Sequence, residues 1–130
     1  AGTLLWKEVK KYGYTRRYFH VSNTCHCFPS KTKTPTKDQI EICSDSWLNR
    51  EIEGADCRLV LACGNVPLYA LKRQSGGIEA LSGTTEWLDD WGVWVCWSTH
   101  PSHVLRNSSK RPLFEKGIKN FIEKFELLKR

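Results

Sequence analysis

Two short apolar runs, at residues 58–63 and 93–97, constrain the fold more than any other feature of the chain. The first run is continuous and stops at Gly64, a pattern typical of a strand that is buried on both faces. Between the runs, residues 66–71 have the pattern of a short helix. Strands that alternate with helices at this spacing predict parallel β-α-β units. We therefore expect an α/β fold, a three-layer α/β/α sandwich around a short parallel sheet, formed by a single domain over residues 1–130.

Further signals along the chain complete this expectation. The expected elements are a helix that ends at Gly13, a strand at residues 18–23, a helix from the cap residue Thr36 to about Glu51, and a last helix that opens at Pro112. Gln39 stands three residues after Thr36, which is the spacing of a capping box. In parallel sheets, ligands bind at the carboxyl ends of the strands. Asn23, Gly64 and His100 all fall at such ends, so they are candidates for a site.

The charge of the chain favours an anionic partner. Its 130 residues carry 20 Lys and Arg against 14 Asp and Glu, a formal net charge of +6. Cations that neutralise phosphates release counterions, so this excess favours nucleic acid. No apolar run approaches the ~20 residues that a membrane span needs, and the amino end carries no signal-peptide pattern. The charge therefore supports a polyanionic partner without establishing one, and we expect no membrane partner.

The six cysteines divide into two groups. Cys63 and Cys96 lie inside the apolar runs, where a thiol behaves as a small apolar side chain. Cys27 and Cys43 lie sixteen residues apart in polar surroundings, and thiolates are suitable ligands for zinc or an iron–sulfur cluster. Without a secretion signal, a reducing compartment is expected and disulfides are not. Two alternatives stay open: unpaired thiols, or a zinc site built from Cys25, His26, Cys27 and Cys43.

The segment that follows the second apolar run carries the candidate catalytic residues. His100 follows the predicted strand, so it is held at the mouth of the sheet, where its neighbours set its pKa and its tautomer. Leu105 is an apolar residue in an otherwise polar loop, and Arg106 stands beside it. A protruding Leu next to Arg suits a wedge that enters a duplex and replaces an extruded base. The alternatives are an ordinary histidine at a strand end and a Leu105 packed into the core.

Six motifs resemble those of family 4 uracil-DNA glycosylases, in the same order and at similar spacing. They are AGTLL at residues 1–5, VSNTCHCFP at 21–29, TPT at 34–36, IEIC at 40–43, VLACGNV at 60–66 and HPSHVLRN at 100–107. The last is similar to the His-Pro-(Ala/Ser)-x-x-Leu-Arg loop of that family. Each motif alone is weak, but the combination covers nearly the whole chain. The resemblance implies the glycosylase fold and the removal of uracil from DNA by base flipping and hydrolysis of the N-glycosidic bond.

The resemblance also implies roles for individual residues. Asn23 would bind the edge of the flipped uracil, because a side-chain amide offers both a donor and an acceptor. His100 would stabilise the uracil anion as the glycosidic bond breaks. Cys27 and Cys43 would be two of the four ligands of a 4Fe–4S cluster, with the other ligands upstream. The residues that would contact DNA are Pro101, Ser102, Leu105, Arg106, Asn107 and Lys110.

Some features of the family lie outside this sequence or differ in it. The family's Cys-x-x-Cys pair, its water-positioning Gly-Glu-Ala-Pro-Gly loop and its uracil-stacking aromatic precede the point that corresponds to Ala1. We expect a missing amino-terminal segment or a second chain to supply them, together with the first strand of the sheet. His26, Phe28 and Ser82 stand where the family usually has Lys, Arg and Arg.

These departures indicate a divergent member of the family, of a viral or polymerase-linked kind. We expect it to act on uracil-containing DNA in the cytoplasm of a bacterial or phage-infected cell. The alternative is a catalytically inactive glycosylase-like module that binds DNA or another protein.

Overall fold

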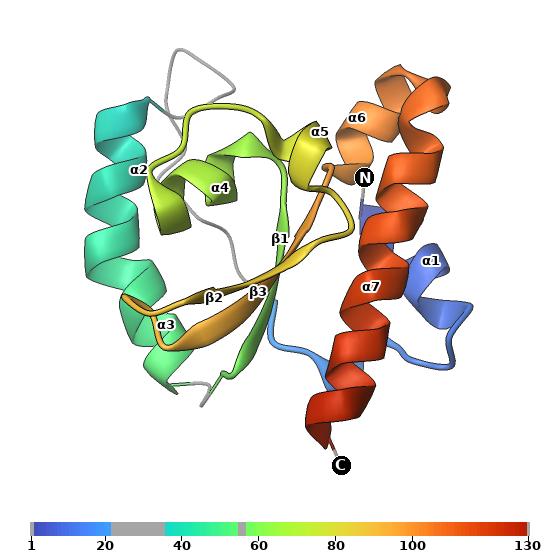
Figure 1. The fold of residues 1–130 in the computed structure, drawn as a ribbon, viewed down its shortest axis with the longest axis horizontal. Helices are drawn as coiled ribbons and strands as arrows, with labels where there is room; N and C mark the ends of the chain where they lie inside the picture. The colour runs from blue at the N-terminus through green and yellow to red at the C-terminus, as the bar shows by residue number, and fades with distance from the viewer. Residues whose placement is uncertain (1, 22–35, 55–56, 130) are drawn as a thin grey trace.

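A computed structural model describes residues 2–21, 36–54 and 57–129. Its sheet has three strands, β1 (Leu59–Cys63), β2 (Thr85–Leu88) and β3 (Val93–Ser98), in the order β1-β3-β2 (Figure 1). β1 and β3 are parallel, and their register runs from Leu59 opposite Trp94 to Cys63 opposite Ser98. The two apolar runs are therefore strands, as the sequence predicts, and their carboxyl ends lie side by side.

The prediction of a short parallel sheet is correct for β1 and β3 but wrong for β2. β2 pairs antiparallel with β3, with Thr85 opposite Cys96 and Leu88 opposite Val93. Only residues 89–92 connect these two strands. Such a connection is long enough for a hairpin and far too short for the crossover that parallel strands require. The sheet is therefore mixed, and its third strand is one that the alternation of apolar runs and helices does not predict.

Helices surround the sheet. They are α1 (Gly2–Lys10), η1 (Arg16–Tyr18), α2 (Lys37–Cys43), η2 (Ser44–Leu48), α3 (Asn49–Gly54), α4 (Asn65–Lys72), α5 (Ile78–Leu81), α6 (Pro101–Arg106), η3 (Ser108–Lys110) and α7 (Arg111–Lys129). The predicted capping box is confirmed: the Gln39 amide donates to Thr36 Oγ1 at 3.2 Å, and the Thr36 amide donates to Gln39 Oε1 at 2.9 Å. From this cap the chain remains helical through α2, η2 and α3. None of the described helices combines the length and the apolar character that crossing a membrane requires.

The strand predicted at residues 18–23 is not formed where the structure describes it. Tyr18 ends η1, and residues 19–21 belong to no strand, while 22 and 23 lie outside the described residues. Phe19 packs against α7 instead, with ring centroids 5.5 Å from Phe121 and 5.0 Å from Phe125. A single aromatic side chain of such a run can pack against a helix while the backbone pairs with no strand, so propensity alone did not predict this segment correctly.

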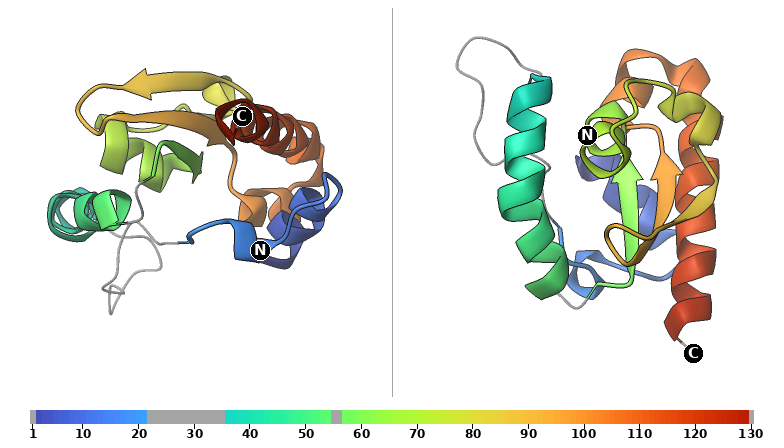
Figure 2. Two further views of the ribbon diagram at one scale, coloured as in Figure 1. Left: turned by 90° about the horizontal axis from the view of Figure 1, so that it is seen from below. Right: turned by 60° about the vertical axis from the view of Figure 1, so that its left-hand side comes forward.

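Helices cover both faces of the sheet, which confirms the expected α/β architecture (Figure 2). Successive side chains of a strand point to opposite faces, and β3 therefore contributes to two cores. Val95 and Trp97 pack with residues of α4 on one face, whereas Cys96 packs with residues of α1, α6 and α7 on the other. β1 is less buried than predicted, because in the described part of the chain it pairs with β3 alone.

Candidate active site

The candidate site lies at the shared carboxyl edge of β1 and β3. The chain turns into α4 at Gly64, whose amide donates to the Ser98 carbonyl at 2.9 Å and so ties the two strand ends together. Gly64 has φ +98° and ψ 177°, a conformation that is essentially restricted to glycine. A β-carbon at Gly64 would lie 3.2 Å from Cβ of His100. The glycine therefore allows the β1–α4 turn to pack directly against this histidine.

His100 is held in one orientation as the cap of α6. Its Nδ1 accepts a hydrogen bond from the Ser102 amide at 3.0 Å, and Ser102 Oγ lies 2.7 Å from the same nitrogen. A backbone N–H can only donate, so Nδ1 carries no proton in this arrangement. The proton of the neutral ring is therefore on Nε2, which becomes a hydrogen-bond donor of fixed orientation.

The surroundings of His100 favour its neutral form. Partial burial of the ring lowers the pKa of His100 below its usual value, and the positive charge of Arg106 lowers it further. A histidine with a lowered pKa stays neutral at neutral pH and donates through Nε2 without carrying a charge. The site can thus offer a hydrogen bond to an oxygen that gains negative charge during a reaction.

The Arg106→Gln substitution is expected to raise the pKa of His100, because it removes a positive charge that disfavours protonation. The pKa is measured from the pH dependence of the imidazole proton shifts in NMR spectra. In the unaltered protein, the unfolded chain binds the proton at higher pH than the folded chain does. Stability is therefore lost as the pH falls below about 6.5, and this loss should shrink in the variant. Lys119→Gln, at an exposed position of α7, is the matched control. A His100 pKa that stays constant or falls in Arg106→Gln would contradict this assignment.

Ser82 and Gly117 hold in place the carboxyl end of β3, which His100 follows. The hydroxyl of Ser82, which is only 3% exposed, accepts from the Thr99 amide at 3.2 Å and donates to the Leu113 carbonyl at 2.7 Å. At Gly117 of α7, a β-carbon would lie only 2.6 Å from Cβ of Ser98. From the sequence, Ser82 was noted only as a departure from a family pattern, and Gly117 was not noted at all. Neither role could be predicted, because the residues that Ser82 and Gly117 contact are far away along the chain.

The end of α6 exposes the residues predicted to form a wedge. Leu105 has 63% of its side chain exposed, and Arg106 is also exposed. The alternative in which Leu105 packs into the core is therefore wrong. In the same helix Pro101 and Val104 are buried, so the helix is anchored by one face while Leu105 projects from it. Pro101 is thus a packing residue as well as a predicted DNA contact.

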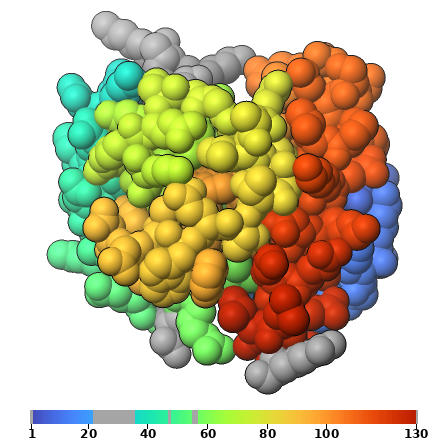
Figure 3. Space-filling view, in the orientation of Figure 1, coloured from blue at the N-terminus to red at the C-terminus, as the bar shows by residue number. Residues whose placement is uncertain are grey.

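The two remaining predicted contacts on this loop have partners within the protein. Asn107 Oδ1 accepts from the amide of Ser109 at 3.2 Å and from its hydroxyl at 2.7 Å, and so caps η3. Lys110 Nζ lies 3.1 Å from Oε2 of Glu79, and its hydrogen bond lowers the pKa of that carboxyl. Glu79 Oε1 also lies 3.1 Å from His103 Nε2, so α5 is bound to the α6–η3 segment, against which it lies in Figure 3.

The predicted residues of the uracil and cluster sites are only partly within the described chain. Asn23 and Cys27 lie outside it. Cys43 ends α2, and its side chain is 5% exposed. No group of three or more possible metal ligands occurs among the described residues. Cys96 is fully buried, as the sequence predicts, whereas Cys63 is only half-buried, although desolvation of its thiol raises the pKa of Cys63 to about 12.

Together, the fold and the site define an α/β protein with a preorganised hydrogen-bond donor at the carboxyl edge of its sheet. The family model of the uracil DNA glycosylase superfamily matches residues 1–126. The chain therefore belongs to the uracil-DNA glycosylase superfamily.

Curated relatives agree with this membership. The chain is 27% identical to a type-4 uracil-DNA glycosylase of Pyrobaculum aerophilum, over 93% of this chain and 64% of the relative. It is 29% identical to a type-4 enzyme of Thermotoga maritima, over 95% of this chain and 67% of the relative. A type-5 uracil-DNA glycosylase of Pyrobaculum aerophilum is 31% identical, over 82% of this chain and 49% of the relative. The chain thus spans about half to two thirds of the length of these relatives.

Proposed function

We propose that this chain carries the base-holding and DNA-opening part of a uracil-DNA glycosylase. The observation that supports this most strongly is the position of His100, which is fixed by Ser102 with its proton on Nε2. An exposed Leu105 and Arg106 follow one turn later on the same short helix. A fixed donor next to an exposed apolar wedge is what removal of a flipped base requires.

In the proposed reaction, the bond between C1′ of the sugar and N1 of uracil breaks. Its electron pair leaves with the base, and the negative charge spreads onto the oxygens of the uracil ring. The neutral His100 donates its Nε2 proton in a hydrogen bond to one of these oxygens, which stabilises the transition state more than the substrate. A water oxygen then bonds to C1′ and releases one proton, and the uracil anion takes up one proton, so that uracil and an abasic site are the products.

We further propose that Asn23 selects uracil and that the α6–η3 loop holds the duplex. A side-chain amide can pair with the donor and acceptor on the edge of uracil, whereas cytosine presents a reversed edge. Leu105 would fill the gap left by the base, and Arg106 would bind a phosphate. Ser102 would orient His100 as well as contact DNA, and the proposed neighbouring contacts are Pro101, Asn107 and Lys110.

Incubation of the purified full-length protein with a duplex that contains a single uracil tests the proposed function, because this chain carries only the base-holding and DNA-opening part of the proposed site. We expect abasic sites, detected as alkali-sensitive cleavage, and none in the matched duplex with thymine. Binding of both duplexes without any abasic product would contradict glycosylase activity and would instead support an inactive DNA-binding module.

Leu105→Ala is expected to slow uracil release from duplex DNA by about tenfold, and to change release from single strands far less. Extrusion of a base from a duplex costs a few kcal/mol, and the cost is smallest in a single strand. The ratio of the two single-turnover rates measures the effect. Leu127→Ala removes an equally exposed leucine at the far end of α7 and should leave this ratio unchanged. An equal loss on both substrates would argue against a wedge.

We also propose that Cys27 and Cys43 are two of the four ligands of a 4Fe–4S cluster. The near-complete burial of Cys43 fits a thiolate ligand that is shielded from water. Such a cluster would serve to hold together the segments that carry its ligands. Analysis of iron, acid-labile sulfide and zinc tests this: Cys43→Ser should lose iron and sulfide together. Zinc alone in the unaltered protein would overturn the proposal.

A further inference from the structure

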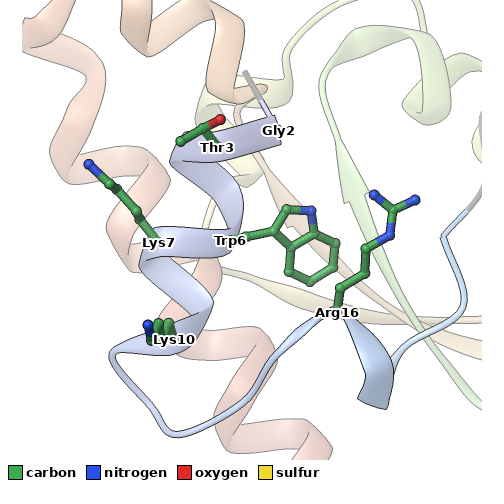
Figure 4. A pocket seen from close by; sticks show the side chains of 6 residues that line it. All are labelled: Gly2, Thr3, Trp6, Lys7, Lys10 and Arg16. Atoms are coloured by element: carbon green, nitrogen blue, oxygen red, sulfur yellow. The ribbon is translucent and has the colours of Figure 1, made fainter.

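The start of the chain forms an open pocket of about 550 Å³ that none of the roles above uses. Its lining residues come from α1 and η1, and they are Gly2, Thr3, Trp6, Lys7, Lys10 and Arg16 (Figure 4). Three of the six carry a positive charge, and none is acidic. A surface hollow with this lining attracts an anionic ligand.

Aromatic contacts hold one of these cations in place. The guanidinium carbon of Arg16 lies 6.0 Å from the centroid of the Trp6 ring, at the limit of a cation–π interaction. The Trp6 ring in turn stacks on Phe19, with centroids 6.4 Å apart and an angle of 26° between the planes. Figure 4 shows the Arg16 side chain alongside the indole. Because Trp6 is already engaged by these neighbours, it orders Arg16 rather than serving as an open platform for a base.

The cations of the pocket have no carboxylate partner within the described residues, in contrast to Lys11 and Lys110. Lys11 pairs with Glu8 at 2.9 Å, and Lys110 pairs with Glu79. Within the described ranges, Lys7, Lys10 and Arg16 form no ion pair. Lys7 and Lys10 are three residues apart on α1, which makes them neighbours on the helix surface, and Figure 4 shows both projecting from the same side. Their charges are therefore available to an external anion.

The pocket is close to the segment proposed to open the duplex. Val9 of α1 and Val104 of α6 belong to one core cluster, and the start of α1 lies beside α6 in Figure 1. The nine residues of α1 span about 13 Å at 1.5 Å per residue. DNA advances about 3.4 Å per nucleotide, so α1 has the length of roughly four nucleotides. A strand that runs along α1 would therefore have about four nucleotides within reach of this helix.

We propose that this pocket binds backbone phosphates of the DNA on one side of the flipped nucleotide, through Lys7, Lys10 and Arg16. This inference rests on the proposed function, since it extends the same DNA-binding surface from α6 onto α1. Phosphodiesters fit better than a free nucleobase, because the lining offers positive charge while the Trp6 ring is occupied. The pocket would add affinity and set the position of the duplex without reading its sequence.

The test is the salt dependence of binding to a duplex without uracil, compared between the unaltered protein and Lys7→Gln/Lys10→Gln. Each phosphate contact contributes about 0.9 to the slope of log affinity against log salt. Loss of two contacts should therefore reduce the slope by almost two. Between 50 and 200 mM salt, the unaltered protein should lose about tenfold more affinity than the variant does.

Two further variants separate a phosphate site from a general effect of charge. Arg50→Gln/Lys124→Gln removes the same charge from α3 and from the distant part of α7, and its slope should stay close to that of the unaltered protein. Lys7→Arg/Lys10→Arg keeps the charge and should keep the slope. The duplex can also be shortened on one side of its centre or on the other. Only one of these two truncations should abolish the difference in salt slope between the unaltered protein and Lys7→Gln/Lys10→Gln.

Excision assays on the same samples distinguish failure of this inference from failure of the proposed function. If the unaltered protein excises uracil and Lys7→Gln/Lys10→Gln has the slope of the unaltered protein, the pocket does not bind DNA and the inference is overturned. The inference is also overturned if Lys7→Gln/Lys10→Gln and Arg50→Gln/Lys124→Gln reduce the salt slope by the same amount. If the unaltered protein binds DNA with the expected slopes but excises nothing, the proposed function fails while the phosphate site stands.

Discussion

Replacement of His100 by alanine is expected to lower the single-turnover rate of uracil release by about a hundred- to a thousandfold. Loss of one preorganised donor to a developing oxyanion has an effect of this size in other enzymes. The expectation follows from the hydrogen bonds of Ser102 to Nδ1, which leave the Nε2 proton as the donor. Binding to DNA without uracil should change little, because the lost interaction strengthens only as the glycosidic bond breaks.

His103→Ala is the matched control for this experiment. His103 lies on the same helix, but its Nε2 faces Glu79 at 3.1 Å, so it anchors α6 to α5 and has no proposed part in the chemistry. Its removal should reduce the rate by a few-fold at most. A His100→Ala rate within tenfold of that of the unaltered protein would show that another group stabilises the departing base.

Gly64→Ala is expected to lower both the stability and the activity of the protein. The alanine would have to adopt φ +98°, and its methyl group would lie 3.2 Å from Cβ of His100. Backbone strain of this kind costs about 1–3 kcal/mol, which should appear in the free energy of unfolding measured with urea. The close contact would also push His100 away from its position against the strand ends, so the rate of uracil release should fall under conditions where the variant is still folded.

Gly54→Ala separates this effect from that of adding a methyl group to any glycine. Gly54 ends α3, and a β-carbon there would meet no atom within 4 Å. This variant should be as stable as the unaltered protein, or slightly more stable, because alanine favours helices by up to about 1 kcal/mol over glycine. If Gly64→Ala behaved in the same way, the proposed coupling between the β1–α4 turn and His100 would be wrong.

Much of the fold could be predicted because it depends on residues that are close together in the sequence. The capping box of Thr36 and Gln39 needs only a three-residue spacing, and the structure contains both of its hydrogen bonds. The apolar runs that became β1 and β3 are recognisable from their continuity alone. His100 follows the second run almost directly, so its place at the edge of the sheet was already implied.

Other features depend on which distant segments meet, and local patterns carry no such information. The direction of β2 follows from the short hairpin that pairs it with β3. Ser82 supports Thr99 from seventeen residues away, and Phe19 finds its partners on α7 rather than in a sheet.

The features of the candidate site likewise divide into those that the sequence predicts and those that only the folded chain shows. The sequence alone is sufficient to name His100, Leu105 and Arg106, because the chemistry of each is recognisable from its own motif. The tautomer of His100, the exposure of Leu105 and the partner of Lys110 required the folded chain. So did the cluster of unpaired cations around Trp6. Burial, hydrogen-bond geometry and charge pairing arise only when separate segments pack together, and these three properties turn a list of reactive residues into a site.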